Sequence, residues 1–111
     1  MFKITMPRGD MRSVSFSVAM EGSPTVDFDE IYFTVKKNTK TDDIIFQKKL
    51  SDNTIILDNN KFIFTIEPED TDGQKYGTYA CDIELVKTGA IKQTSIGELI
   101  LTEEVTFASN E

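Results

Sequence analysis

The chain has 111 residues, and its 12 basic and 19 acidic side chains give a formal net charge of −7. This balance disfavours a nucleic-acid ligand, because binding to phosphates depends on a concentrated basic surface. No stretch approaches the roughly 20 apolar residues that cross a bilayer, so we expect no membrane partner.

Length and cysteine content limit the number of domains and disulfides that the chain can have. A chain of 111 residues predicts one domain, residues 1–111. The single cysteine, Cys81, cannot form an intramolecular disulfide, and residues 1–10 lack the apolar segment and cleavage site of a signal peptide. We therefore expect a protein of the reducing cytoplasm that is not secreted through a signal peptide.

Short runs of period-two alternation dominate the first half of the chain and predict strands with one buried face. These runs lie at residues 2–4, 14–18, 31–35 and 44–48. Pro7-Arg8-Gly9-Asp10 should end the first run, and Glu21-Gly22-Ser23-Pro24 should form the turn before the third. The third run should be a central strand, whereas the charged end of the fourth, at Lys48, suits a sheet edge.

The second half continues the same pattern. A hairpin is expected between residues 54–57 and 61–66, because Asp58-Asn59-Asn60 tolerates the positive φ of tight turns. Pro68 should end that ladder and leave room for at most one helical turn. Further strands follow at residues 79–85, 91–94 and 96–101, with Val105 and Phe107 closing the sheets. Seven to nine short strands predict an all-β, antiparallel β-sandwich.

The composition lacks the residue types that familiar catalytic centres need. The chain has no histidine, which excludes Ser-His-Asp and Cys-His nucleophilic systems and zinc sites that need histidine. Cys81 lies on the apolar face of an alternating run, where it should behave as a small hydrophobe. The six glycines are dispersed singly, so no phosphate-binding loop is present. We expect no enzymatic activity and no cofactor.

Two short motifs have a functional and a structural interpretation. Asp70-Thr71-Asp72-Gly73 has the form that opens a calcium loop, but the twelfth loop position is Cys81 instead of glutamate. A solvated turn, with no metal, is the better interpretation. Arg8-Gly9-Asp10 is the tripeptide that integrins bind, yet the same three residues form a good turn.

Family resemblance supplies a more specific hypothesis. The segments that carry it are residues 6–10, 14–18, 31–37, 64–71, 77–85 and 97–101, with a Pro-Glu-Asp-Thr turn at Pro68 and a Gly-x-Tyr-x-Cys-Asp strand at Gly77. Over nearly its whole length the chain is similar to the N-terminal domain of phage baseplate upper proteins. The resemblance implies an immunoglobulin-like sandwich that docks to neighbouring tail components without catalysis. Gly77-x-Tyr79-x-Cys81 also resembles the tyrosine corner of immunoglobulin domains.

These observations lead to two functional hypotheses. The first is a small phage or prophage virion protein, of tail or baseplate type, in the bacterial cytoplasm or the assembled virion. Its partners would be other phage structural proteins and possibly a second copy of itself, bound through residues 44–48 or the loop at residues 67–73. The alternative is a carbohydrate- or receptor-binding sandwich that uses the exposed aromatic residues Tyr32 and Tyr76.

Overall fold

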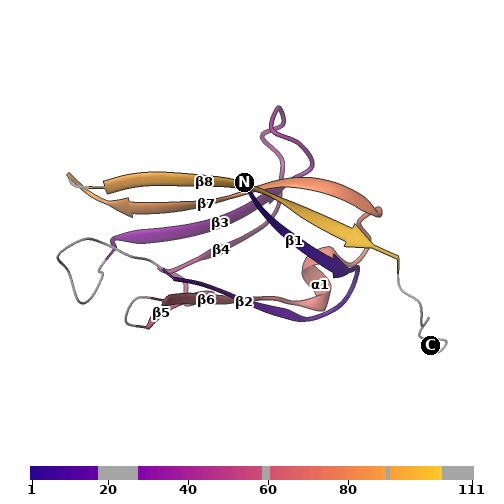
Figure 1. Cartoon of the computed structure of the whole chain (residues 1–111), viewed down its shortest axis with the longest axis horizontal. Coiled ribbons are helices and arrows are strands. Elements are labelled where there is room, and N and C mark those ends of the chain that lie inside the picture. Colours follow the sequence, from indigo (N-terminus) through magenta and orange to yellow (C-terminus); the bar gives the residue numbers. More distant parts are fainter. Residues whose placement is uncertain (18–27, 59–60, 90, 104–111) are drawn as a thin grey trace.

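A computed structural model of the chain describes residues 1–17, 28–58, 61–89 and 91–103 (Figure 1). These residues form eight strands and one short helix. The elements are β1 (Phe2–Pro7), β2 (Arg12–Ser17), β3 (Glu30–Lys36), β4 (Ile44–Lys49), β5 (Ile55–Asp58), β6 (Lys61–Ile66), α1 (Pro68–Thr71), β7 (Gly77–Lys87) and β8 (Ile91–Thr102). The turn expected at Glu21, the residues Asn59 and Asn60, and Val105 and Phe107 lie outside the described part of the chain.

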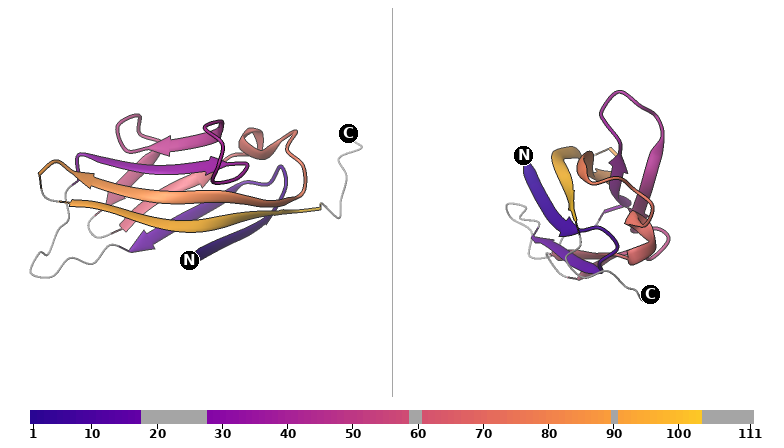
Figure 2. Two further views of the ribbon diagram at one scale, coloured as in Figure 1. Left: turned by 90° about the horizontal axis from the view of Figure 1, so that it is seen from above. Right: turned by 90° about the vertical axis from the view of Figure 1, so that its right-hand side faces the viewer.

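The strands form two sheets that pack face to face, as the end-on view in Figure 2 makes clear. One sheet has the order β1-β8-β7-β3-β4, and the other has the order β2-β6-β5. In chain order, β2 to β8 correspond to immunoglobulin strands B, C, C′, D, E, F and G, with B, E and D in one sheet and C′, C, F and G in the other. The predicted all-β, immunoglobulin-like sandwich is therefore confirmed.

The first strand departs from the antiparallel arrangement. β1 pairs with β8 in parallel, from Phe2 opposite Gly97 to Pro7 opposite Thr102. After β1 the chain crosses to β2 in the other sheet. The neighbour of β1 in its own sheet is therefore β8, a strand far away in the sequence. The two halves expected for the last strand, residues 91–94 and 96–101, form one continuous strand of 12 residues.

Inward-facing apolar residues of both sheets fill the space between them. Ile31, Phe33 and Val35 of β3 are at most 1% exposed, which confirms the central strand predicted from their alternation. Phe33 stacks on Phe64 of the opposite sheet with ring centroids 4.3 Å apart. Phe16 stacks on Phe62 at 5.3 Å, in the same sheet. Aromatic stacking across the core adds specific geometry to the burial of apolar area.

The position of Lys48, at the charged end of β4, differs from the expectation drawn from the sequence. β4 is an edge strand, as expected, but Lys48 does not face solvent. The Lys48 side chain is 10% exposed, and its Nζ lies 2.6 Å from Oδ2 of Asp70, in α1. Alternation along β4 places residue 48 on the same inward face as Phe46, so the lysine points into the sandwich and needs a buried counter-ion.

Candidate docking groove

An open groove of about 580 Å³ lies at one end of the five-stranded sheet. One wall is the β3–β4 connection, residues 37–43, which projects from the sheet in Figure 1. The other wall is the segment 73–79 that leads into β7. Ile45 and Tyr79 are the more buried lining residues, and the polar lining includes Lys37, Asn38, Thr41, Asp43, Gln74 and Lys75.

Arg8 fixes the wall formed by residues 73–79. Its guanidinium carbon lies 4.4 Å from the centroid of the Tyr76 ring, and Nη1 donates a hydrogen bond of 3.0 Å to the backbone carbonyl of Gln74. Nη2 also donates to the Tyr76 hydroxyl at 3.1 Å. These contacts hold the Tyr76 ring in one orientation while leaving the residue 43% exposed.

Two further hydrogen bonds anchor the same wall to the body of the sandwich. The buried Thr71 accepts a hydrogen bond from the backbone amide of Gly9 at its Oγ1, over 2.8 Å. Tyr79 donates from its hydroxyl to the backbone carbonyl of Lys75 over 2.6 Å. A tyrosine near the start of strand F that bonds to the backbone a few residues upstream is the tyrosine corner of immunoglobulin domains. The motif expected at Tyr79 is therefore present.

The ion pair between Lys48 and Asp70 connects this wall to β4. Asp70 Oδ2 also accepts a hydrogen bond of 2.7 Å from the backbone amide of Glu67, which caps the single turn of α1. The two regions expected to serve as contact surfaces, residues 44–48 and 67–73, are thus joined to each other through a pair whose side chains are only 10% and 14% exposed. Within these two regions, Ile44, Pro68, Glu69 and Asp72 remain exposed.

Local hydrogen bonds shape the opposite wall. Asn38 Oδ1 accepts a hydrogen bond of 2.9 Å from the amide of Lys40, and Thr41 Oγ1 accepts one of 3.1 Å from the amide of Asp43. Such short-range bonds stabilise turns without burying side chains. The groove lining contains two lysines and one aspartate, so it does not share the acidic excess of the whole chain.

The structure separates the two tyrosines proposed as binding residues. Tyr76 borders the groove, whereas Tyr32 is half-buried on the outer face of the five-stranded sheet, between Glu84 and Lys49. Glu84 lies seven residues beyond Gly77 on β7, or roughly 23 Å at about 3.3 Å per residue. Tyr32 and Tyr76 therefore cannot form one sugar-binding site, and only Tyr76 borders a concave surface of this size.

Residues of both short motifs take part in packing contacts. Arg8 of the Arg-Gly-Asp tripeptide is engaged with Tyr76 and Gln74, so its guanidinium is part of the fold. Asp70 of the calcium-like motif is engaged with Lys48 and Glu67. Within the described residues, no group of three or more acidic, cysteine or histidine side chains is arranged to hold a metal ion.

Cys81 lies in the core, as its position in the alternation predicted. The residue is 5% exposed, and burial raises the pKa of its thiol to about 12, with the carboxylates of Asp82 and Glu98 adding to the rise. The thiol is consequently protonated at neutral pH. A protonated, buried thiol is a poor nucleophile and a poor metal ligand.

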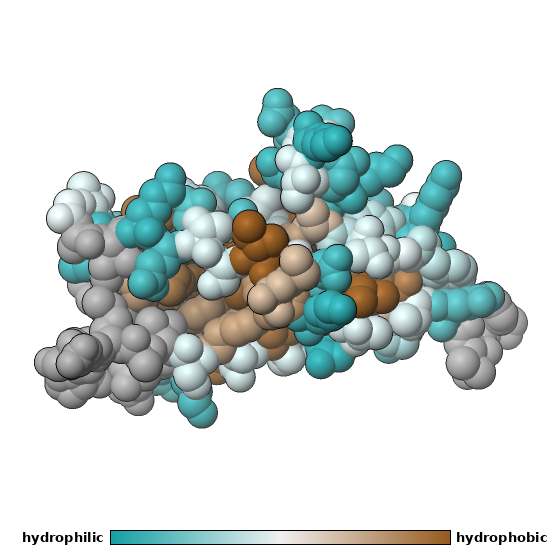
Figure 3. All heavy atoms as spheres, turned by 45° about the horizontal axis from the view of Figure 1, so that its top comes forward, coloured by the Kyte–Doolittle hydropathy of each residue, from teal (hydrophilic) through white to brown (hydrophobic). Residues whose placement is uncertain are grey.

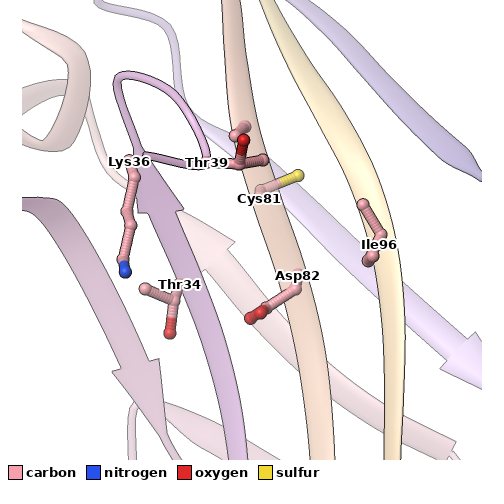
Figure 4. Close-up of a pocket in the computed structure, with 7 residues that line it drawn as sticks. Thr34, Lys36, Thr39, Cys81, Asp82 and Ile96 are labelled. Carbon is pink, nitrogen blue, oxygen red and sulfur yellow. The ribbon is translucent and has the colours of Figure 1, made fainter. Parts of the chain in front are cut away.

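A second, smaller hollow of about 150 Å³ lies on the outer face of the five-stranded sheet (Figure 4). Thr34 and Lys36 come from β3, Asp82 comes from β7, and Ile96 comes from β8. Burial raises the pKa of Asp82, and the neighbouring Glu84 adds to the rise. Asp82 is the one carboxylate in the lining of this hollow, and we assign no chemistry to it.

Sequence patterns revealed some of the groove and missed the rest. Tyr76 and the tyrosine corner were visible from the sequence, and Gly73 and Gly77, both with positive φ, mark the irregular wall between α1 and β7. The opposite wall at residues 37–43 contains no motif that identifies it in the sequence. Its approach to segment 73–79 is a consequence of the β4-β3-β7 strand order.

Comparisons with known proteins leave the family open. No family model matches the chain, and no curated protein matches it. Among solved structures, it is similar to part of a Bacteroides vulgatus protein that is provisionally named a glycoside hydrolase, at 13% identity and a TM-score of 0.44. That match covers 94% of this chain and 17% of the other. No helix in the described residues is long and apolar enough to span a membrane.

Proposed function

We propose that this chain is a non-enzymatic structural and assembly module of a phage or prophage particle, of tail or baseplate type. The observation that carries the proposal is the groove beside Tyr76, whose wall is fixed in advance by Arg8 and Thr71. A partly apolar groove with one wall held by hydrogen bonds suits docking, because ordering that wall costs little further conformational freedom when a partner binds. The resemblance to the N-terminal domain of baseplate upper proteins supports the same role.

The chemistry of the groove fits a protein partner. Its lining mixes the aromatic ring of Tyr76 and the side chain of Ile45 with lysine, amide and hydroxyl groups. Interfaces of moderate size combine an aromatic anchor with a polar rim in this way. The partner in this proposal is another structural protein of the particle, and the chain acts in the bacterial cytoplasm during assembly or in the finished virion.

The test is incorporation into particles. In the bacterium that carries the gene, prophage would be induced, particles would be banded by density, and the chain would be quantified by mass spectrometry. We expect the wild-type chain in the particle band and Tyr76→Ala reduced there, with Tyr32→Ala as the matched control on the other surface. Absence of the wild-type chain from banded particles would overturn the proposal.

Tyr76 also favours a second candidate function, binding of a carbohydrate or a surface receptor. Its exposed ring borders a groove that contains the amides Asn38 and Gln74 and the carboxylate of Asp43, and sugar sites combine such groups. A glycan array with the wild type, Tyr76→Ala and Tyr32→Ala separates the candidates. Binding that is lost only in Tyr76→Ala would favour the sugar, and no binding to any glycan would remove this candidate.

A further inference from the structure

The groove beside Tyr76 continues along the outer face of β7. A further hollow of about 260 Å³ is lined, among others, by Thr78 and Ala80 of β7 and by Ile96 of β8, which is 57% exposed. It shares lining residues with the groove, including Lys37, so the two lie end to end and together form what we call the β7 track. In Figure 3 the projecting β3–β4 connection is mainly hydrophilic, and apolar residues gather on the face of the molecule beside it. A long concave track of this shape suits an extended chain segment.

Lysines stand on both walls of the groove that begins this track. Lys37 belongs to the β3–β4 connection and Lys75 to the segment 73–79, and both are exposed. Among the interactions of the described residues, neither lysine takes part in an ion pair. Asp43 is the single acidic residue of the groove lining. The groove therefore presents more positive than negative charge, although the whole chain carries a net charge of −7.

The environment of the Tyr76 ring also favours a negatively charged partner. Arg8 places its guanidinium carbon 4.4 Å from the ring centroid, and its Nη2 donates to the tyrosine hydroxyl. A cation against one face of a ring offsets the negative potential that would otherwise attract a cation of the partner. The positive charge of Arg8 also adds to that of the two lysines. Tyr76 is still 43% exposed, so its ring can pack on an apolar side chain of the partner.

We propose that the β7 track binds an extended, acidic segment of a partner protein. The acidic residues of that segment pair with Lys37 and Lys75, and its apolar residues cover the exposed parts of Tyr76 and Ile96. The segment therefore carries its acidic residues at one end and apolar residues toward the other. This inference rests on the docking role proposed above for the groove, and it names the chemistry of the partner segment that docks there.

The charges along the track disfavour other occupants. Glu98 lines the hollow at the far end of the track, where it lies 3.9 Å from Lys3 of β1. The acidic residues of a segment docked in the reverse direction would approach Glu98, and a basic segment would approach the two lysines. Both arrangements bring like charges together, which lowers affinity. A neutral glycan would leave both lysines without a counter-charge, whereas an acidic protein segment pairs with them and also supplies apolar side chains.

Selection of peptides by the purified full chain tests the inference. Short random peptides from a displayed library would be selected for binding, and the dissociation constants of the enriched peptides would be measured by calorimetry. We expect enriched peptides to carry aspartate or glutamate close to aromatic or aliphatic residues, and to bind more weakly as the salt concentration rises. The double variant Lys37→Glu with Lys75→Glu should raise these dissociation constants about tenfold, because each substitution replaces an attraction by a repulsion.

The matched control is Lys61→Glu with Lys92→Glu, which changes the net charge equally at two exposed lysines outside the track and should leave binding nearly unchanged. A selection that enriches basic or purely apolar peptides, or that yields no binder, would overturn the inference. So would acidic peptides that bind both double variants equally well. A chain that selects no acidic peptide but is present in banded particles would lose this inference and keep the proposed function. Acidic peptides selected by a chain that is absent from particles would remove the role in a particle and keep the chemistry of the track.

Discussion

Replacing Lys48 by methionine should lower the free energy of unfolding by about 3 kcal/mol. Methionine keeps the unbranched stem that packs beside Phe46, so the principal loss is the cation 2.6 Å from Asp70. Removing one partner of a buried ion pair costs about 3–5 kcal/mol, because the other charge stays buried and uncompensated. The lower end applies here, since Asp70 retains the amide of Glu67 at 2.7 Å and is 14% exposed.

A double variant separates the loss of the pair from other effects. Lys48→Met with Asp70→Asn removes both charges and keeps an oxygen that can accept the amide of Glu67. Replacing a buried pair by neutral groups is often close to neutral for stability. We therefore expect the double variant to be more stable than Lys48→Met alone, by about 2 kcal/mol, although it carries one more substitution.

Urea unfolding followed by far-ultraviolet circular dichroism measures both effects. With a slope of about 1–1.5 kcal/mol per molar urea, a loss of about 3 kcal/mol moves the midpoint down by about 2–3 M. Lys49→Met is the matched control, because Lys49 is the next residue and is only half-buried. It should change stability by less than about 0.5 kcal/mol. Equal stability losses in Lys48→Met and Lys49→Met would refute this account of the pair.

Three further substitutions probe other contacts by the same unfolding assay. Gly97→Ala should cost about 1–3 kcal/mol, because a Cβ there would lie 2.6 Å from the Phe2 ring, and adding Phe2→Ala should recover part of that loss. Equal losses with and without Phe2→Ala would contradict the steric explanation. Tyr79→Phe should cost about 1 kcal/mol through loss of the corner hydrogen bond, and an unchanged midpoint would argue against that bond. Asp82→Asn should stabilise the fold by up to about 0.5 kcal/mol at neutral pH. Burial and then Glu84 raise the pKa of Asp82, so the wild type loses stability as the pH rises from the unfolded pKa to the folded pKa. The asparagine variant should lack that loss, and identical pH profiles for the two proteins would refute it.

The fold could be predicted because alternation is a local signal. Phe62, Phe64 and Ile66 alternate with polar or exposed residues, and all three are at most 2% exposed in the structure. The same signal misled at Lys48, where a charged residue at the end of an apolar run suggested a solvated edge. The inward position of Lys48 depends on Asp70, a partner 22 residues away that strand periodicity does not register.

Pairings between distant strands could not be predicted from the same signal. The parallel alignment of β1 with β8 joins residues near opposite ends of the chain, and neither strand contains a feature that specifies its neighbour. Because β8 is longer than β1, β1 pairs only with the second half of β8. Likewise, the contact of Arg8 with Tyr76 joins residues 68 positions apart, and strand periodicity contains no signal for it.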